Sequence, residues 1–175
     1  KGGLAIGTMF MMVAISAMNG LSVAGMAIGA TIALPEMLKR NYDKRMITGV
    51  VQAGSSLGIL IPPSVVMVLY GMIARQPVSK LWMAGILPGL LMASLFLIYI
   101  YVRCKLQPEL GPPLKKEERE VSTIEKIRLL KAGIIPFLIF FLMTGLFLMG
   151  IASLVECSAV GAFLATLAAI YKRRF

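Results

Sequence analysis

The feature that most restricts the fold is residues 81–102, a run without a charged side chain. A helix needs about 20 consecutive apolar residues to cross the hydrocarbon core of a bilayer. The run therefore predicts a transmembrane helix over residues 81–103. Trp82 near its start and Tyr99 and Tyr101 near its end are typical of the aromatic belts at membrane surfaces.

The composition extends this expectation to the whole chain. Of the 175 residues, 58% are hydrophobic and only 15% are charged, and the mean hydropathy is +0.85. Soluble domains are about 45–50% apolar and about one quarter charged. Because so short a soluble fold could not bury this much apolar surface, we expect an all-α integral membrane protein.

The apolar block of residues 1–38 is divided by the polar segment Asn19-Gly20-Leu21-Ser22. Each arm is shorter than a full transmembrane span. The pattern predicts a re-entrant helical hairpin with its tip at this segment, followed by a basic loop at residues 39–45. The alternative is a pair of short, tilted spans.

The block of residues 46–74 is too long for one span and too short for two, and Pro62 and Pro63 lie near its middle. Proline lacks a backbone N–H and clashes with the preceding helical turn. Two adjacent prolines after Gly54 and Gly58 therefore predict a discontinuous transmembrane helix. Irregular backbone at membrane depth is tolerated only inside protein or beside a watery cavity. The alternative is a purely structural kink.

Three segments complete the chain. Residues 104–133 are polar and predict a cytoplasmic loop that includes an amphipathic helix along the membrane surface. A solvated connector is the simpler interpretation of this loop, and an interaction arm is the alternative. Residues 134–155 and 156–171 predict two further transmembrane helices joined by a minimal turn at Glu156.

The basic residues indicate the orientation. The chain has 18 Lys and Arg and 8 Asp and Glu, for a net charge of +10. With residues 39–45 in the cytoplasm, Arg75 and Lys80 are the only two basic residues placed outside, as the positive-inside rule favours. The basic residues flank apolar segments without interleaved aromatics, so nucleic-acid binding is not expected. We expect a multi-pass integral membrane protein.

Several kinds of chemistry are excluded by the residues present. The chain has no histidine, and its two cysteines form no CxxC motif. The acids closest to the apolar blocks, Glu36, Asp43 and Glu156, lie at block ends rather than within a span. We therefore expect that the chain is not an enzyme, and in particular not a paired-aspartate protease. We also expect no buried proton relay and no cofactor.

Oxygen atoms are abundant at the two interruptions. Discontinuous helices that meet near the midplane are the recurring binding device of secondary transporters. Na⁺ is a hard cation that favours oxygen ligands, so carbonyls and hydroxyls there predict a sodium site. The candidate hydroxyls are Ser22, Ser55, Ser56 and Ser64, with Asn19 as a further donor. The alternative is that these small residues only let helices pack closely.

Three phrases in this order resemble the large permease (M) subunit of the tripartite ATP-independent periplasmic (TRAP) transporters. They are Leu34-Pro35-Glu36-Met37, Asn41-Tyr42-Asp43-Lys44-Arg45 and Gly58-Ile59-Leu60-Ile61-Pro62-Pro63-Ser64. The resemblance covers essentially the whole chain. It implies an internal fragment with the first of two inverted repeats and the start of the second. The tip, which is commonly Ser-Gly-Ser-Ser in the family, departs from that pattern at Leu21.

The resemblance implies an elevator-type, sodium-coupled carrier in the bacterial inner membrane that takes up an organic acid such as a C4-dicarboxylate or sialic acid. The implied partners are a small membrane (Q) subunit and a periplasmic substrate-binding protein. Alternatives are a related anion carrier without a binding protein and a structural helix bundle. The implied ion and substrate site consists of Asn19, Gly20, Ser22, Gly54, Ser55, Ser56, Gly58, Pro62, Pro63 and Ser64.

Overall fold

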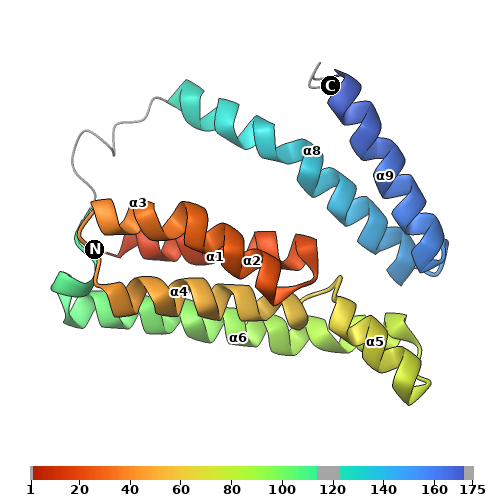
Figure 1. Ribbon diagram of the computed structural model, residues 1–175, viewed down its shortest axis with the longest axis horizontal. Helices are drawn as coiled ribbons and strands as arrows, with labels where there is room; N and C mark the ends of the chain where they lie inside the picture. The colour runs from red at the N-terminus through yellow and green to blue at the C-terminus, as the bar shows by residue number, and fades with distance from the viewer. Residues whose placement is uncertain (1, 114–122, 172–175) are drawn as a thin grey trace. The chain divides into compact units, whose positions relative to one another are not determined.

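A computed structural model describes residues 2–113 and 123–171, in two units divided between Lys116 and Glu117 (Figure 1). All regular secondary structure in these two ranges is helical, as expected. The charged run at residues 115–120 and the basic tail at residues 172–174 lie outside the described residues. The side chains of residues 123–132, which carry the expected amphipathic pattern, are likewise not described.

The first unit begins with a helical hairpin. Helix α1 (Gly3–Asn19) ends at Gly20, and the chain returns through α2 (Ser22–Ile28), the π-helical segment η1 (Gly29–Ala33) and α3 (Leu34–Lys39). The two arms approach closely at Gly29, which has no side chain. A Cβ at this position would lie only 2.7 Å from Met12 Cε. The re-entrant placement of this hairpin in a membrane stays a prediction.

A broken helix and a long helix follow the hairpin. Helix α4 (Lys44–Ser56) begins at the carboxylate of Asp43, whose Oδ1 accepts the backbone N–H groups of Arg45 (2.9 Å) and Met46 (3.2 Å). It leads into a 3₁₀ turn, η2 (Leu57–Ile59), and then α5 (Val65–Ala74). Helix α6 (Val78–Leu106) ends before a short turn, η3 (Pro108–Leu110).

Helix α6 is longer than the expected 81–103. It starts directly after Pro77 and ends before Pro108. These two prolines, rather than the limits of the apolar run, mark the ends of the helix. Trp82 is buried with 4% of its surface exposed, whereas Tyr99 and Tyr101 are exposed, and the position of all three at membrane surfaces stays a prediction.

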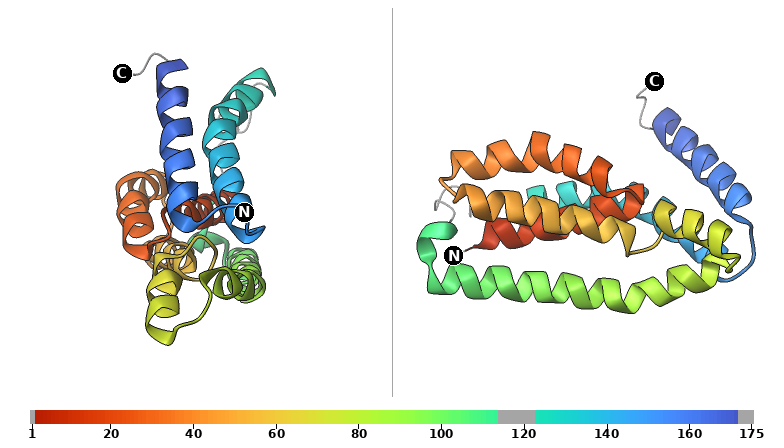
Figure 2. Two further views of the ribbon diagram at one scale, coloured as in Figure 1. Left: turned by 90° about the vertical axis from the view of Figure 1, so that its right-hand side faces the viewer. Right: turned by 60° about the horizontal axis from the view of Figure 1, so that its bottom comes forward.

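The core of the first unit joins the hairpin to α4 and α6. The right-hand view of Figure 2 shows α4 (orange) and α6 (green) running lengthwise along this unit. Its buried members include Met9, Met37, Ile47, Ile100 and Cys104. At one end, the N–H of Gly2 donates to Gly111 O (3.0 Å) and the N–H of Asp43 donates to Leu110 O (3.4 Å). These contacts hold the start of the hairpin and the start of α4 against the end of α6.

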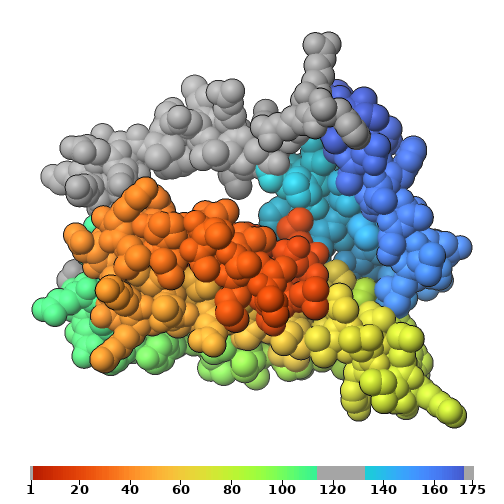
Figure 3. Space-filling model, in the orientation of Figure 1, coloured from red at the N-terminus to blue at the C-terminus, as the bar shows by residue number. Residues whose placement is uncertain are grey.

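The outer face of the hairpin's returning arm is apolar. Figure 3 shows this arm, orange to red, on the near side of the first unit. Val23 and Ile32 expose 75% and 57% of their surface. In the part of the chain that the structure describes, two helices, Val78–Leu106 and Leu154–Tyr171, are long and apolar enough to cross a membrane, and only 22% and 11% of their most apolar windows are buried. Apolar outward faces of this kind are what lipid-facing helices require.

The second unit is a pair of helices, α8 (Thr123–Leu148) and α9 (Leu154–Tyr171). The boundaries differ from those expected. The amphipathic segment and the span after it are one continuous helix, although Gly133 and Pro136 lie between them. The turn occupies residues 149–153 rather than Glu156.

The start of α9 explains the role of Glu156. Its Oε2 accepts the backbone N–H of Ser153 (2.7 Å) and the Ser153 hydroxyl (2.8 Å), and the Glu156 N–H faces Ser153 Oγ at 3.4 Å. This is a capping box, in which serine and the glutamate three residues later satisfy each other's free N–H groups. Glu156 therefore fixes the first turn of α9.

Candidate functional site

The interruption expected within residues 46–74 is present. Helical structure stops after η2 at Ile59 and resumes at α5, and residues 60–64 between them are non-helical. Pro62 and Pro63, joined by a cis peptide bond, provide no N–H to continue the helix. Ser64 starts α5, since its Oγ accepts the Met67 N–H (3.3 Å) and donates to Ile59 O (2.5 Å). We call residues 57–64 the break.

The tip of the hairpin contacts the break, as expected. The N–H of Val65 donates to Gly20 O at 3.2 Å. Gly20 has a left-handed backbone (φ 65°), and a Cβ there would lie 2.7 Å from Pro63 O. Only glycine adopts this conformation without cost and leaves room for the neighbouring carbonyl. The structure thus brings Gly20, Pro63 and the start of α5 together.

Gly54 and Gly58, predicted beside a bound ion, lie against α1. A Cβ on Gly58 would be 2.6 Å from Ser16 O, and a Cβ on Gly54 would be 2.5 Å from Met12 Cβ. These positions allow close approach of two helices, which is the usual role of small residues in membrane proteins. For these two glycines the structure favours close packing.

The predicted serines lie around the break with different exposure. Ser55 is buried and donates to Val51 O (2.6 Å), whereas Ser56 is exposed and donates to Ala53 O (2.8 Å). Ser64 is buried at the start of α5, and Ser22 is half-buried at the start of α2. A hydroxyl that donates its proton keeps lone pairs on its oxygen. These oxygens remain chemically able to bind a cation.

Asn19 lies at the end of α1 and is exposed. Its Nδ2 donates to Ile15 O at 2.8 Å. The side-chain amide group is thereby oriented by its own helix, and its carbonyl oxygen is still available as a ligand.

Ser16 was missed by the sequence analysis. It is completely buried one turn before the tip, and its carbonyl accepts the Gly20 N–H at 2.9 Å. Its Oγ has no hydrogen-bond partner among the described residues and lies against Gly25. A buried hydroxyl without a partner is costly, so it marks a position that needs an explanation. Its place one turn before a polar tip was the available sequence signal.

Helix α6 holds the break from another side, which the sequence analysis also missed. The indole N–H of Trp82 donates to Ser64 O at 3.3 Å. A Cβ on Gly85 would lie 2.5 Å from Leu60 O, and one on Gly89 would lie 2.7 Å from Ile61 Cγ1. The break is therefore enclosed by the hairpin tip and by the glycine-containing face of α6.

The chemistry available at the break is that of neutral oxygens and backbone N–H groups. Within residues 2–113 and 123–171, no group of three or more His, Cys, Asp or Glu could hold a metal ion. Two helical segments end at this contact, α1 at Asn19 and η2 at Ile59, and two begin, α2 at Ser22 and α5 at Val65. Helix ends present carbonyl oxygens and helix starts present N–H groups, so both a cation and an anion could be bound.

Comparison with known proteins gives a consistent family. The family model for the tripartite ATP-independent periplasmic transporter, DctM component, matches residues 1–175. The C4-dicarboxylate TRAP transporter large permease protein DctM of Pseudomonas aeruginosa is 38% identical over 102 residues, 58% of this chain and 24% of that protein.

Two other relatives are named for different substrates. The ectoine/5-hydroxyectoine TRAP transporter large permease protein UehC of Ruegeria pomeroyi is 37% identical over 103 residues, 58% of this chain and 24% of UehC. The 2,3-diketo-L-gulonate TRAP transporter large permease protein YiaN of Escherichia coli is 29% identical over 167 residues, 94% of this chain and 37% of YiaN.

No solved structure matches the chain. The matched part spans about a quarter of the length of the first curated relatives (24%). Since the family model matches from the first residue to the last, the chain belongs to the DctM family of TRAP transporter components.

Proposed function

We propose that this chain is part of the large permease subunit of a sodium-coupled transporter that takes up an organic acid. A periplasmic binding protein delivers the acid, and a small membrane subunit is the further partner, as the word tripartite in the family description suggests. The names dicarboxylate and gulonate among the relatives both denote carboxylates. An elevator-type movement of the first unit is part of the proposal.

The observation that carries the proposal is the hydrogen bond from the Val65 N–H to Gly20 O (3.2 Å). It joins two helix interruptions that are far apart in the sequence. In secondary transporters, half-helix N-termini face anionic substrate groups and unwound carbonyls coordinate the coupling ion. Here the starts of α2 and α5 suit a carboxylate, and the ends of α1 and η2 suit Na⁺.

We expect Ser56→Ala and Ser22→Ala, made in the full-length transporter, to raise the Na⁺ concentration for half-maximal uptake by about tenfold. Hydrogen bonds to charged groups contribute about 1.5–3 kcal/mol, and about 1.4 kcal/mol corresponds to tenfold in affinity. The measurement is uptake of the transported acid into proteoliposomes as a function of external Na⁺.

Ser94→Ala is the matched control for this experiment. Ser94 is in α6 and its hydroxyl donates to Leu90 O (2.8 Å), a bond within one helix like that of Ser56. The control should leave the Na⁺ dependence unchanged. If Ser22, Ser55, Ser56 and Ser64 can all be replaced by alanine without changing it, the serines only pack helices and the sodium site is elsewhere.

The proposed orientation has a separate test. Gln76 and Glu109 are exposed at opposite ends of α6, whose 29 residues extend about 43 Å. With Cys104 and Cys157 replaced by alanine, a membrane-impermeant maleimide should label Gln76→Cys in intact cells and Glu109→Cys only after permeabilisation. The reverse pattern would contradict a cytoplasmic position for residues 104–133.

A further inference from the structure

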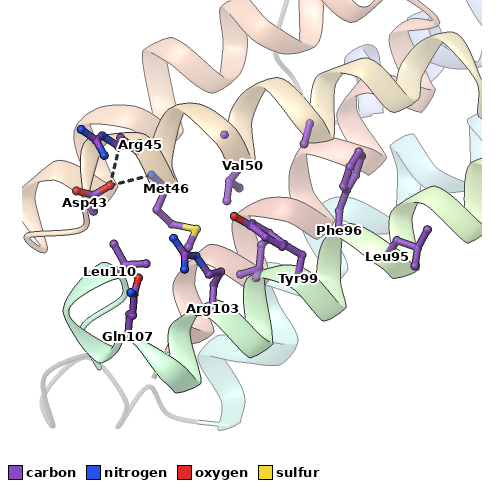
Figure 4. Close-up of a pocket in the computed structure, with 13 residues that line it drawn as sticks. Asp43, Arg45, Met46, Val50, Leu95, Phe96, Tyr99, Arg103, Gln107 and Leu110 are labelled. Atoms are coloured by element: carbon purple, nitrogen blue, oxygen red, sulfur yellow. Dashed lines mark hydrogen bonds between the residues drawn. The ribbon is translucent and has the colours of Figure 1, made fainter.

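A groove of about 790 Å³ lies between α4 and α6 in the first unit, at the end away from the break. Figure 4 shows the side chains that line it. On α6 its lining residues include Phe96, Tyr99 and Arg103, which follow each other at helical spacing along one face, and Gln107 lines it directly after the helix ends. The groove is independent of the ion and substrate site proposed above.

One half of this groove, which we call the α4–α6 groove, is apolar. Val50 and Ala53 from α4 and Leu95 and Phe96 from α6 line it. Leu95 and Tyr99 expose 53% and 60% of their surface. Apolar walls this open to the surroundings favour an apolar occupant over water.

The other half carries positive charge. Arg45 and Arg103 line it together with Gln107, and all three side chains are exposed. Among the described residues neither guanidinium has an ion pair, in contrast to Arg40, which pairs with Glu36. The one acid in the lining is Asp43, which accepts the N–H groups that start α4, and two arginines against this one acid give the groove a net positive charge.

Charge and apolar surface are separated along the groove. Figure 4 shows Arg45, Gln107 and Arg103 toward one end and Phe96 and Leu95 toward the other. Leu95 and Arg103 are about 12 Å apart along the axis of α6. A soluble anion would contact only the charged end, and an apolar helix would leave both guanidinium groups unpaired.

We propose that the α4–α6 groove binds an anionic phospholipid. The phosphate accepts hydrogen bonds from Arg45 and Arg103, with Gln107 as a further donor, and an acyl chain lies against Val50, Leu95 and Phe96. Arginine pairs with phosphate through two parallel hydrogen bonds, and basic pockets between transmembrane helices bind acidic headgroups. The end of the first unit that bears Arg45 and Arg103 is the one that the basic residues place on the cytoplasmic side.

The test is native mass spectrometry of the full-length protein with dioleoyl phosphatidylglycerol and dioleoyl phosphatidylcholine. We expect a preference for phosphatidylglycerol that falls about tenfold in the double variant Arg45→Gln and Arg103→Gln, since the charge-assisted hydrogen bonds to the phosphate are lost. Arg75→Gln with Lys80→Gln removes the same charge at the other end of α6 and should keep the preference.

A second variant addresses the apolar half. Ala53→Trp adds bulk in the groove without changing charge, and we expect it to weaken binding of phosphatidylglycerol while the protein keeps its elution volume in size-exclusion chromatography. Equal binding of both lipids by the unaltered protein would overturn the proposal. So would competition by free glycerol phosphate at the concentration at which the lipid itself competes, because that result would indicate a headgroup-only anion site.

Discussion

Replacing Gly20 by alanine is expected to lower the thermal unfolding midpoint of the full-length transporter and to reduce its uptake rate more than tenfold. The left-handed backbone at φ 65° costs a non-glycine residue about 1–2 kcal/mol. The added Cβ would also lie 2.7 Å from Pro63 O, a backbone atom that cannot move without displacing the break. Overpacking of this kind costs about 1–3 kcal/mol. The unfolding midpoint in detergent and uptake into proteoliposomes measure the two effects.

Gly150→Ala separates the two causes. Gly150 has nearly the same backbone (φ 70°), but nothing lies within 4 Å of its Cβ position. This control variant should be destabilised only by the free energy that the left-handed conformation costs an alanine. Equal losses in both variants would show that the contact between the tip and the break contributes nothing.

The interruptions in the helices could be predicted because they depend on local chemistry. Pro62 and Pro63 lack N–H groups, and Gly20 allows the chain to reverse, so both interruptions are visible in the sequence. Their contact was expected from the recurring architecture of transporters, since the sequence contains no distance between Gly20 and Val65. The structure adds the hydrogen bond itself.

The parts that were missed depend on which face of a helix is buried. Helix α6 is apolar on all sides, so periodicity could not show that Trp82, Gly85 and Gly89 face the break. Ser16 was missed for the same reason, because it lies in an apolar run without amphipathic pattern. The capping box of Ser153 and Glu156 was readable as serine followed three residues later by glutamate, and it places the start of α9 at Leu154.

Gly58→Ala is expected to destabilise the protein by about 1–3 kcal/mol and to impair uptake. The new Cβ would lie 2.6 Å from Ser16 O, 2.8 Å from Ser16 Cβ and 2.9 Å from Ser16 C. Two of these three atoms belong to the backbone of α1, so α1 and the break must separate. Gly7→Ala is the control, because nothing lies within 4 Å of a Cβ at this exposed position of α1. It should stabilise the protein by up to about 1 kcal/mol through helix propensity.

A double-mutant cycle locates the strain of Gly58→Ala. Ser16→Gly removes the Cβ at 2.8 Å but leaves the carbonyl oxygen at 2.6 Å, so it should restore only part of the stability lost in Gly58→Ala. Thermal unfolding of the two single variants and the double variant measures this coupling. If the losses add, Ser16 and Gly58 are not in contact in the working protein. If the rescue is partial, Ser16 of α1 contacts Gly58 of the break in the folded protein, as the distances indicate.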